Sequence, residues 1–216
     1  DILIQPDGKI LIAGAFTSYN GNPSNRLARI NSDGSFDNTF NVGAGANNLI
    51  SSIAIQNDNK VIIAGNFTSY NGNAYNRIAR INSDGSFDNS FTNGTGANAF
   101  ITKVLYQPDG KVLAFGDFAT FNGYNRNSIV RLNSDGTIDE TFLISTGANA
   151  SVLAATLQPD GKIILGGVFT DINGVLGNGI AKLNSNGSVD TTFNTPSGSN
   201  SNVEEFAFQP DGKMLV

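Results

Sequence analysis

The chain has 216 residues, 39% of them hydrophobic, and a formal net charge of −5. It contains no cysteine, histidine or tryptophan, which excludes disulfides, cysteine nucleophiles, histidine acid–base catalysis and ordinary zinc or copper sites within it. The negative charge without basic patches argues against nucleic acid as a partner, and no apolar run is long enough for membrane insertion.

A unit of 51 residues repeats along the chain without insertion. Its clearest markers are two residue types that recur at this constant step: Gln5, Gln56, Gln107, Gln158 and Gln209 with Phe16, Phe67, Phe118 and Phe169. A period of this size is typical of modular arrays, whose units bury their apolar faces against one another. We expect residues 1–216 to be one β-propeller region, with four repeats and the start of a fifth, in a longer chain.

Four strands are predicted in each unit, and in the second unit they are Ile50–Gln56, Lys60–Thr68, Asn76–Asn82 and Ser86–Phe91. The second strand is apolar on both faces and should be buried on both sides, whereas the fourth alternates ring and polar residue and should be covered on one face. Four antiparallel strands in a unit of this length favour a propeller blade over a β-helix coil. The predicted fold is all-β, a β-propeller of four-stranded antiparallel blades that is a fragment of a larger ring.

Two tight turns punctuate each unit. The first joins strands one and two, as Pro6-Asp7-Gly8, and the second joins strands three and four, as Asn31-Ser32-Asp33-Gly34. Glycine accepts positive φ and aspartate hydrogen-bonds locally, so both patterns predict hairpins. Between strands two and three we expect a longer loop, residues Ser18–Asn25.

Two motifs at constant separation carry a family resemblance. Residues Ile4–Phe16 read Ile-Gln-Pro-Asp-Gly-Lys-Ile-Leu-Ile-Ala-Gly-Ala-Phe, residues Arg29–Phe40 read Arg-Ile-Asn-Ser-Asp-Gly-Ser-Phe-Asp-Asn-Thr-Phe, and the pair recurs in the later units. This pattern resembles the delta-60 repeat family of bacterial β-propellers over essentially the whole chain. The resemblance implies a large secreted or surface-attached protein and brings no shared catalytic residues.

A calcium site is the first chemical hypothesis to weigh. Asn31-x-Asp33-Gly34-x-x-Asp37 partly matches the acidic loop of calcium-binding propellers, with oxygen donors around a glycine turn. However, Arg29 stands where the first aspartate of that loop belongs, and its charge would oppose a cation. We interpret the motif as a structural turn in which Asp37 caps backbone or pairs with Arg29, and predict neither a metal nor another cofactor.

Enzymatic function finds little support in the residues that differ between units. A glycosidase needs two carboxylates flanking one bond, and the unshared acidic residues show no convergence: Asp117, Glu140, Asp171, Glu204 and Glu205. We therefore predict no catalytic residues.

The longer loop provides the candidate binding site. Its aromatic residues stand beside Asn-Gly pairs, and the loops of successive blades would form a ring of aromatic and amide groups able to hold a neutral sugar. Alternatively, the same rings pack over their own hairpins. Tyr75, Tyr124 and Arg126 vary between units and are the more discriminating surface positions. The candidate ligand-binding residues are Tyr19, Asn20, Tyr70, Asn71, Tyr75, Phe121, Asn122, Tyr124 and Arg126.

Together these patterns indicate a non-catalytic module of a secreted or cell-surface bacterial protein, acting in adhesion or protein–protein scaffolding. The expected partners are a protein or a cell-surface glycan, besides the remaining blades of the same parent chain. A carbohydrate-binding module, the non-catalytic part of a polysaccharide-acting enzyme and a phage fibre component are the alternatives.

Overall fold

Each repeat folds into one antiparallel sheet, here called a blade, whose middle strand pairs with both others. The computed structural model describes residues 1–193, 195 and 197–216. The blades consist, in order, of β1 (Ile2–Ile4), β2 (Ile10–Ala13) and β5 (Leu27–Ile30); β6 (Ile50–Ile55), β7 (Val61–Gly65) and β10 (Ile78–Ile81); β11 (Ile101–Tyr106), β12 (Val112–Gly116) and β15 (Ile129–Leu132); and β16 (Val152–Leu157), β17 (Ile163–Gly167) and β20 (Ile180–Leu183). Within these described residues there is no helix, and thus none able to span a membrane.

The fourth strand of each blade is shorter than predicted. It is reduced to a single β-bridge, which joins Ile81 to Phe87 in the second blade and recurs at the same step in the others. The side chain of Asp88 then accepts a hydrogen bond from the Ser90 amide at 2.9 Å, and this local turn withdraws the backbone from further pairing. The all-β propeller prediction is confirmed, with three full strands and one bridge per blade.

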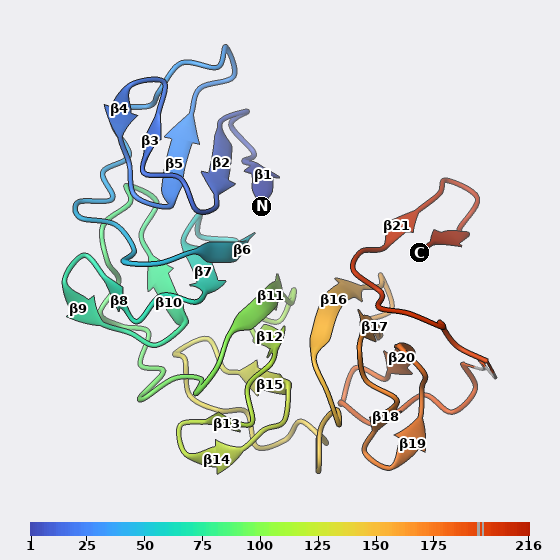
Figure 1. Ribbon diagram of the computed structural model, residues 1–216. Helices are drawn as coiled ribbons and strands as arrows, with labels where there is room; N and C mark the ends of the chain where they lie inside the picture. The colour runs from blue at the N-terminus through green and yellow to red at the C-terminus, as the bar shows by residue number, and fades with distance from the viewer. Residues whose placement is uncertain (194, 196) are drawn as a thin grey trace.

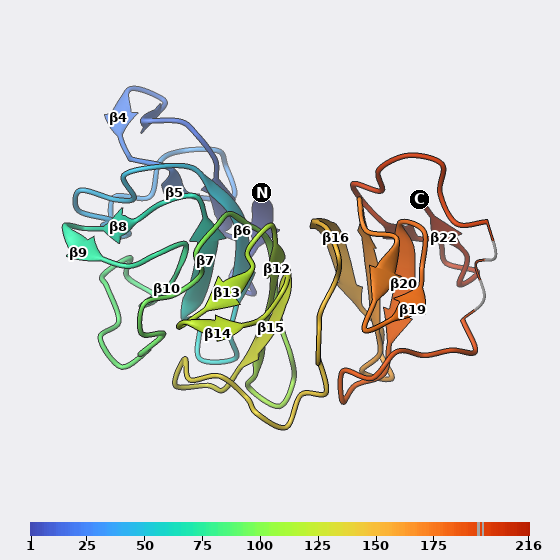
Figure 2. The same cartoon turned by 60° about the horizontal axis from the view of Figure 1, so that its bottom comes forward.

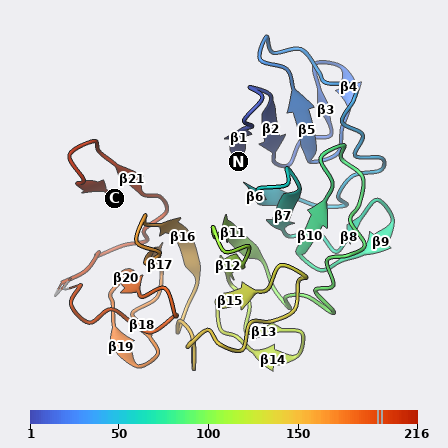
Figure 3. The same cartoon turned by 180° about the vertical axis from the view of Figure 1, so that it is seen from behind.

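The four blades follow one another around an arc (Figure 1). The first strand of each blade lies toward the inside of the arc and the short hairpins lie on its outside, as the view from behind in Figure 3 also shows. Figure 2 shows the same arc with its lower side turned forward. A last hairpin, β21 (Ala207–Phe208) with β22 (Met214–Leu215), lies at the opposite end of the arc from β1.

The hydrophobic core lies between blades rather than within them. In β7, Val61 and Ile63 belong to the cluster that includes Leu11 and Leu27 of the first blade. The alternate residues of β7, Ile62 and Ala64, belong to the cluster that includes residues of the third blade. All five residues of β7 are buried, so the predicted burial of this strand on both sides is confirmed.

The segment predicted as a longer loop is instead a compact hairpin in each blade. These hairpins are β3 (Ser18–Tyr19) with β4 (Asn22–Pro23), β8 (Ser69–Tyr70) with β9 (Asn73–Ala74), β13 (Thr120–Phe121) with β14 (Tyr124–Asn125), and β18 (Asp171–Ile172) with β19 (Val175–Leu176). We call them the outer hairpins. The Asn-Gly pair at each tip has positive φ at both residues, 48° and 79° at Asn71 and Gly72, which is the two-residue turn that matches strand twist.

Candidate functional site

The aromatic residues in the first strand of the outer hairpins point into the protein. Tyr70 and Phe121 are fully buried and Tyr19 is half-buried. The hydroxyl of Tyr70 donates to the carbonyl oxygen of Gly85 at 3.1 Å, and that of Tyr19 to Gly34 at 3.0 Å. Burial, followed by the charge of Asp84, raises the pKa of Tyr70. These rings pack over their own blades, the alternative that the sequence left open, and Tyr70 and Phe121 offer no free face for stacking.

The asparagines at the hairpin tips hold the chain that connects one blade to the next. The side-chain oxygen of Asn71 accepts a hydrogen bond from the Ala44 amide at 3.0 Å, and that of Asn122 from the Gly96 amide at 3.0 Å. Asn20, at the same position in the first blade, is exposed. Asn71 and Asn122 therefore fix inter-blade connections, a use of these residues that the sequence reasoning missed.

Three of the candidate residues have side chains on the outer surface. Tyr124 is 59% exposed, and Arg126, two residues further along, pairs with Glu140 at 3.0 Å. Tyr75 is half-buried, and its ring lies 4.4 Å from the ring of Phe87, centroid to centroid. The structure thus places Tyr124 and Arg126 on the outside of the third blade and Tyr75 on the second, rather than gathering all nine candidates at one face.

A buried aspartate paired with a lysine recurs in every blade, and in the first three blades an arginine joins the pair. In the first blade, the carboxylate of Asp37 accepts hydrogen bonds from Lys9 at 2.8 Å and from Arg29 at 2.6 Å. Burial alone would raise the pKa of Asp37, but hydrogen bonds from Lys9, Thr39 and Arg29 outweigh it and lower that pKa below its ordinary range. The pairing of Asp37 with Arg29, proposed above against a calcium loop, is what the structure shows.

The same arginine reaches the next blade. Arg29 donates through Nη1 to the carbonyl oxygen of Ser83 at 2.7 Å, and its guanidinium lies 4.7 Å from the centre of the Phe40 ring. Arg80 and Arg131 repeat both contacts in the second and third blades. Within the described part of the chain, no group of three or more acidic, histidine or cysteine side chains is arranged to hold a metal ion. The charges of the cluster join blades to one another.

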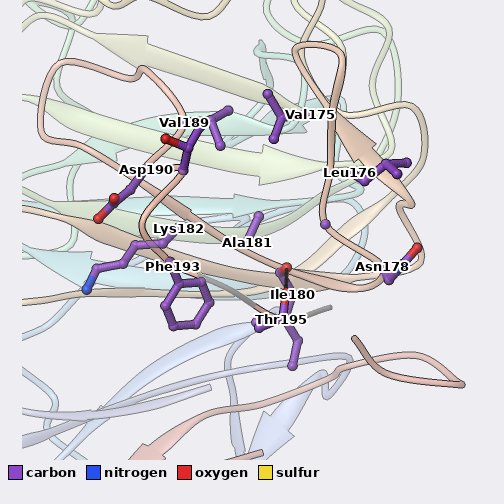
Figure 4. A pocket seen from close by; sticks show the side chains of 12 residues that line it. Val175, Leu176, Asn178, Ile180, Ala181, Lys182, Val189, Asp190, Phe193 and Thr195 are labelled. Carbon is purple, nitrogen blue, oxygen red and sulfur yellow. Dashed lines mark hydrogen bonds between the residues drawn. The ribbon is translucent and has the colours of Figure 1, made fainter. Parts of the chain in front are cut away.

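A cavity of about 280 Å³ lies between the outer hairpin of the fourth blade and Ile180, Lys182 and Phe193, whose counterparts in the second blade are buried against the third blade. Figure 4 shows its lining, which includes Val175 and Leu176 of the outer hairpin together with Val189 and Phe193. Gly177 also lines it. A smaller cavity of about 140 Å³ occupies the corresponding place in the first blade, lined by Pro23, Ser24 and Phe36 among others.

Comparison with known proteins supports the architecture. The WD40 β-propeller domain of Doa1 is similar in structure, with a TM-score of 0.55, 14% identity, and coverage of 87% of this chain and 52% of that one. The extracellular domain of BT4673 from B. thetaiotaomicron, from a one-component system, gives a TM-score of 0.53 and 16% identity over 99% of this chain and 25% of its own. The chain thus spans about half and a quarter of these proteins, and at such identity the likeness shows the fold alone.

Sequence comparison adds the family. Among curated proteins, none is significantly similar to the chain. A family described as "Domain of unknown function (DUF5122) beta-propeller" matches at residues 5–40, 56–91, 107–142 and 158–193. Each match begins at the recurring glutamine and ends at the phenylalanine that follows the buried aspartate. The matches therefore include both motifs of each repeat from the glutamine onward. The chain belongs to the DUF5122 β-propeller family.

Proposed function

We propose that the chain is a non-catalytic β-propeller module of a secreted or surface-displayed bacterial protein, acting in adhesion or protein–protein scaffolding. One observation carries this proposal: the recurring residues are buried in blade contacts, whereas the outer hairpins carry exposed side chains that differ from blade to blade. Tyr124 and Leu176, 59% and 79% exposed, are the clearest examples. A surface varied on a constant frame is the arrangement expected of a recognition module.

Two further points support this setting. The chain that is similar in structure from B. thetaiotaomicron is an extracellular domain, and the paired motifs resemble those of delta-60 repeats, which we propose these units to be. The net charge of −5 favours a protein or a cell-surface glycan over nucleic acid as the partner. Exposed tyrosine beside arginine is a composition enriched at protein interfaces.

The proposal is tested by binding rather than by activity. The chain, labelled at its N-terminus, is incubated with intact bacterial cells and with isolated surface proteins, and bound material is quantified for wild type and for the double variant Tyr124→Ala with Arg126→Ala. We expect the double variant to lose at least about tenfold in affinity, because truncating central Tyr and Arg anchors typically costs more than 1 kcal/mol each. Leu143→Ser, which changes an exposed apolar residue of an inter-blade connection, is the matched control. Equal binding by all three proteins would contradict a role for this surface.

Carbohydrate binding is a second candidate, favoured by one detail. Tyr124 exposes its ring next to Asn125 and Arg126, and a free aromatic face beside amide and guanidinium donors suits a sugar ring. A glycan array probed with wild type and with Tyr124→Ala separates the two candidates. Signal that is lost in the variant favours the glycan, and signal that is absent for wild type favours a protein partner.

A further inference from the structure

One position of the repeat borders the junction between successive blades and differs among them. It is occupied by Arg26, Arg77, Ser128 or Gly179, at the constant step of 51. In the second blade, the guanidinium of Arg77 donates through Nη1 at 2.8 Å to the carbonyl oxygen of Ala97. Ala97 belongs to the connection between β10 and β11. The junction between the second and third blades therefore contains a guanidinium group that the chain itself supplies.

At the junction between the third and fourth blades this position is Ser128, and a recess of about 320 Å³ is present. Arg77 and Ser128 share a left-handed backbone conformation, with φ of 70° and 61°, so their side chains leave the backbone in the same way. The recess is lined by Asp117 and Ser128 of the third blade and by Ala148 and Ser151 of the connection to the fourth, among others. The serine side chain is too short to fill the space that an arginine takes.

This recess lies between two blades that both have their three strands. Strand β16 of the fourth blade lies beside β12 of the third (Figure 1). Short side chains at the junction open the recess, because Ser128 replaces Arg77 and Ser151 stands where the preceding junction has Phe100. The recess is therefore a property of the residues at this junction.

The recess keeps the acceptor that holds the guanidinium in the second blade. Ala148 is the counterpart of Ala97, and each forms a single β-bridge to the outer hairpin of the following blade, Ala97 to Phe121 and Ala148 to Ile172. Among the described residues, no backbone amide donates to the carbonyl oxygen of Ala148. That oxygen can accept a hydrogen bond from a ligand in the recess.

This junction also gains a carboxylate. Asp117 stands where the second blade has Asn66, and the backbone of Ser128 pairs with the residues on both sides of it, at 2.7 and 3.1 Å. Asp117 is exposed, and the ion pairs of the third blade, among the described residues, involve Asp139 and Glu140 instead. The recess thus combines a shortened arginine position, a carbonyl acceptor and an unpaired negative charge.

We propose that this recess binds a guanidinium group, presented by an arginine side chain of a partner protein. The molecule itself provides the template, because Arg77 places its guanidinium against Ala97 in the second blade. In the third blade, Asp117 and the Ala148 carbonyl accept the N–H groups of the incoming guanidinium. Its planar fork suits two acceptors at once, and it is more weakly hydrated than an ammonium group.

The test is a titration of ethylguanidinium into the ¹⁵N-labelled chain at low ionic strength, because salt screens exposed charges. We expect saturable shifts of the backbone amides of Ser128, Ala148 and Ser151, with a dissociation constant on the order of 10 mM, as suits so small a ligand. N-ethylurea, of similar shape but uncharged, and n-butylammonium, charged but without the fork, should each bind at least about threefold more weakly.

Three changes in the chain sharpen the test. Ser128→Arg copies the second blade and should abolish the shifts. Asp117→Asn should weaken binding about threefold to fivefold, the range of an exposed ion pair. Asp109→Asn is its matched control, since it removes an exposed carboxylate at the opposite end of β12 and should leave the affinity unchanged. Arg77→Ser with Asn66→Asp copies the third blade into the second and should add saturable shifts at Ala97.

Binding that depends on Asp117 and is lost in Ser128→Arg would establish a guanidinium site. Equal or tighter binding of the peptide acetyl-Gly-Arg-Gly-amide would assign the site to an arginine side chain, whereas exclusion of this peptide would overturn that assignment in favour of a free guanidinium compound. The proposal would be overturned by the absence of saturable shifts, by equal affinity for N-ethylurea, or by unchanged binding in Ser128→Arg. The recess does not include Tyr124 or Arg126, so this site and the proposed function fail independently.

Discussion

At the scale of single residues, the buried arginine of each of the first three blades has two roles at once. Arg80 donates through Nε to Asp88 at 2.6 Å and through Nη1 to the Ser134 carbonyl of the next blade at 2.6 Å. It also lies over the Phe91 ring. Because the side chains of both Arg80 and Asp88 are only 8% exposed, the pair is held in a region of low dielectric, where removal of one partner leaves a charge poorly compensated.

The first prediction concerns this arginine. Arg80→Leu should lower the free energy of unfolding by about 3 kcal/mol, the lower end of the range for breaking a buried ion pair, because Lys60 still contacts Asp88. Urea unfolding followed by circular dichroism measures the loss. Lys182→Leu is the matched control, since Lys182 replaces this arginine in the fourth blade and, among the described residues, has no carboxylate within ion-pair distance. Equal losses in the two variants would refute a special role for the arginine.

The second prediction concerns the loss of stability at acidic pH. Hydrogen bonds from Lys162 and then Thr192 lower the pKa of Asp190 to about 2, and the pKa values of Asp37, Asp88 and Asp139 are also lowered, where bonds from the partners outweigh burial. An unfolded aspartate titrates near about 3.9. A depressed folded pKa contributes stability that is fully present above the unfolded value and is lost as the pH falls through the folded one.

The melting temperature should therefore be steady above about pH 4–5 and fall steeply between about pH 4 and pH 2. Asp190→Asn should melt below wild type at pH 6, and the two curves should converge as the pH approaches 2. Differential scanning calorimetry at fixed ionic strength checks this. A gap between wild type and variant that stays constant with pH would show that the carboxylate charge of Asp190 contributes nothing.

At the scale of elements, turns and hairpins stabilise the contacts between blades as well as the fold of each blade. Gly85, in the turn before the fourth strand, has a φ of +88°, and a Cβ there would come within 2.9 Å of the backbone of Asn41. In the same region the Asn41 amide donates to the Asp84 carbonyl at 2.7 Å. The turn of one blade is thus shaped to receive the connection that leaves the previous one.

The third prediction uses two glycines with similar backbone angles. Gly85→Ala and Gly72→Ala both introduce strain at positive φ, about 1–2 kcal/mol. Gly72 has no neighbouring atom within 4 Å of an added Cβ, so its variant should show this strain alone. Gly85→Ala should cost at least about 1 kcal/mol more, because its Cβ meets the backbone of Asn41. Equal unfolding free energies for the two variants would mean that the backbone of Asn41 moves aside for the added Cβ at no cost in stability.

The fourth prediction concerns the hairpin-tip asparagines. Asn71→Gly keeps the positive φ of 48° but removes the acceptor for the Ala44 amide, so we expect a loss of about 1 kcal/mol and faster hydrogen exchange at Ala44. Asn20→Gly, at the same φ of 48°, is the control and should be close to neutral, because among the described residues no backbone amide donates to the Asn20 side chain. Unchanged exchange at Ala44 in the Asn71 variant would show that the side chain does not hold this connection.

At the scale of the whole molecule, the cores shared between blades make each blade dependent on its neighbours. The two ends of the arc show what an uncovered blade exposes: Ile2 and Ile4 of β1 are each 70% exposed, and Phe208 and Leu215 lie open at the other end. Exposed apolar side chains on an edge strand favour pairing with another chain.

The fifth prediction follows from this exposure. The 216-residue chain should self-associate at micromolar concentration, and Ile2→Lys with Ile4→Lys should reduce that association, because charge on an edge strand opposes pairing. Sedimentation velocity over a range of concentrations measures the effect. Phe208→Lys tests the opposite end of the arc in the same way. A monomer at all concentrations would show that these surfaces do not attract one another.

The sequence predicts the architecture well because period, turns and strand patterns agree. The Pro-Asp-Gly and Asp-Gly turns and the two-sided strand Val61–Gly65 are local features, and the structure confirms them. The sequence predicts too long a fourth strand, because the alternation around Asp88 suggests a half-exposed face, whereas Asp88 is buried by its pairing with Arg80. The constant spacing of this arginine and aspartate in the first three repeats is the available signal.

The candidate site was less predictable, for a physical reason. Tyr70 can stack, and Asn71 can hydrogen-bond, equally well with a ligand or with other parts of the protein. The direction of the backbone decides whether each side chain faces the solvent or the protein. The Asn-Gly turn shortens the segment to a hairpin, turning the Tyr70 ring inward and bringing Asn71 to the preceding connection.

The contact between arginine and the next blade has a consequence for how such a chain changes over generations. Arg29, Arg80 and Arg131 each donate to the serine carbonyl 54 residues ahead, at 2.6–2.7 Å. Recombination between repeats that adds or removes one whole unit therefore leaves every remaining junction as it was. The position occupied by Tyr75, Arg126 or Gly177 lies outside that junction and is free to diverge. Blade number and the composition of the exposed outer surface can thus evolve separately, with the surface changing one blade at a time.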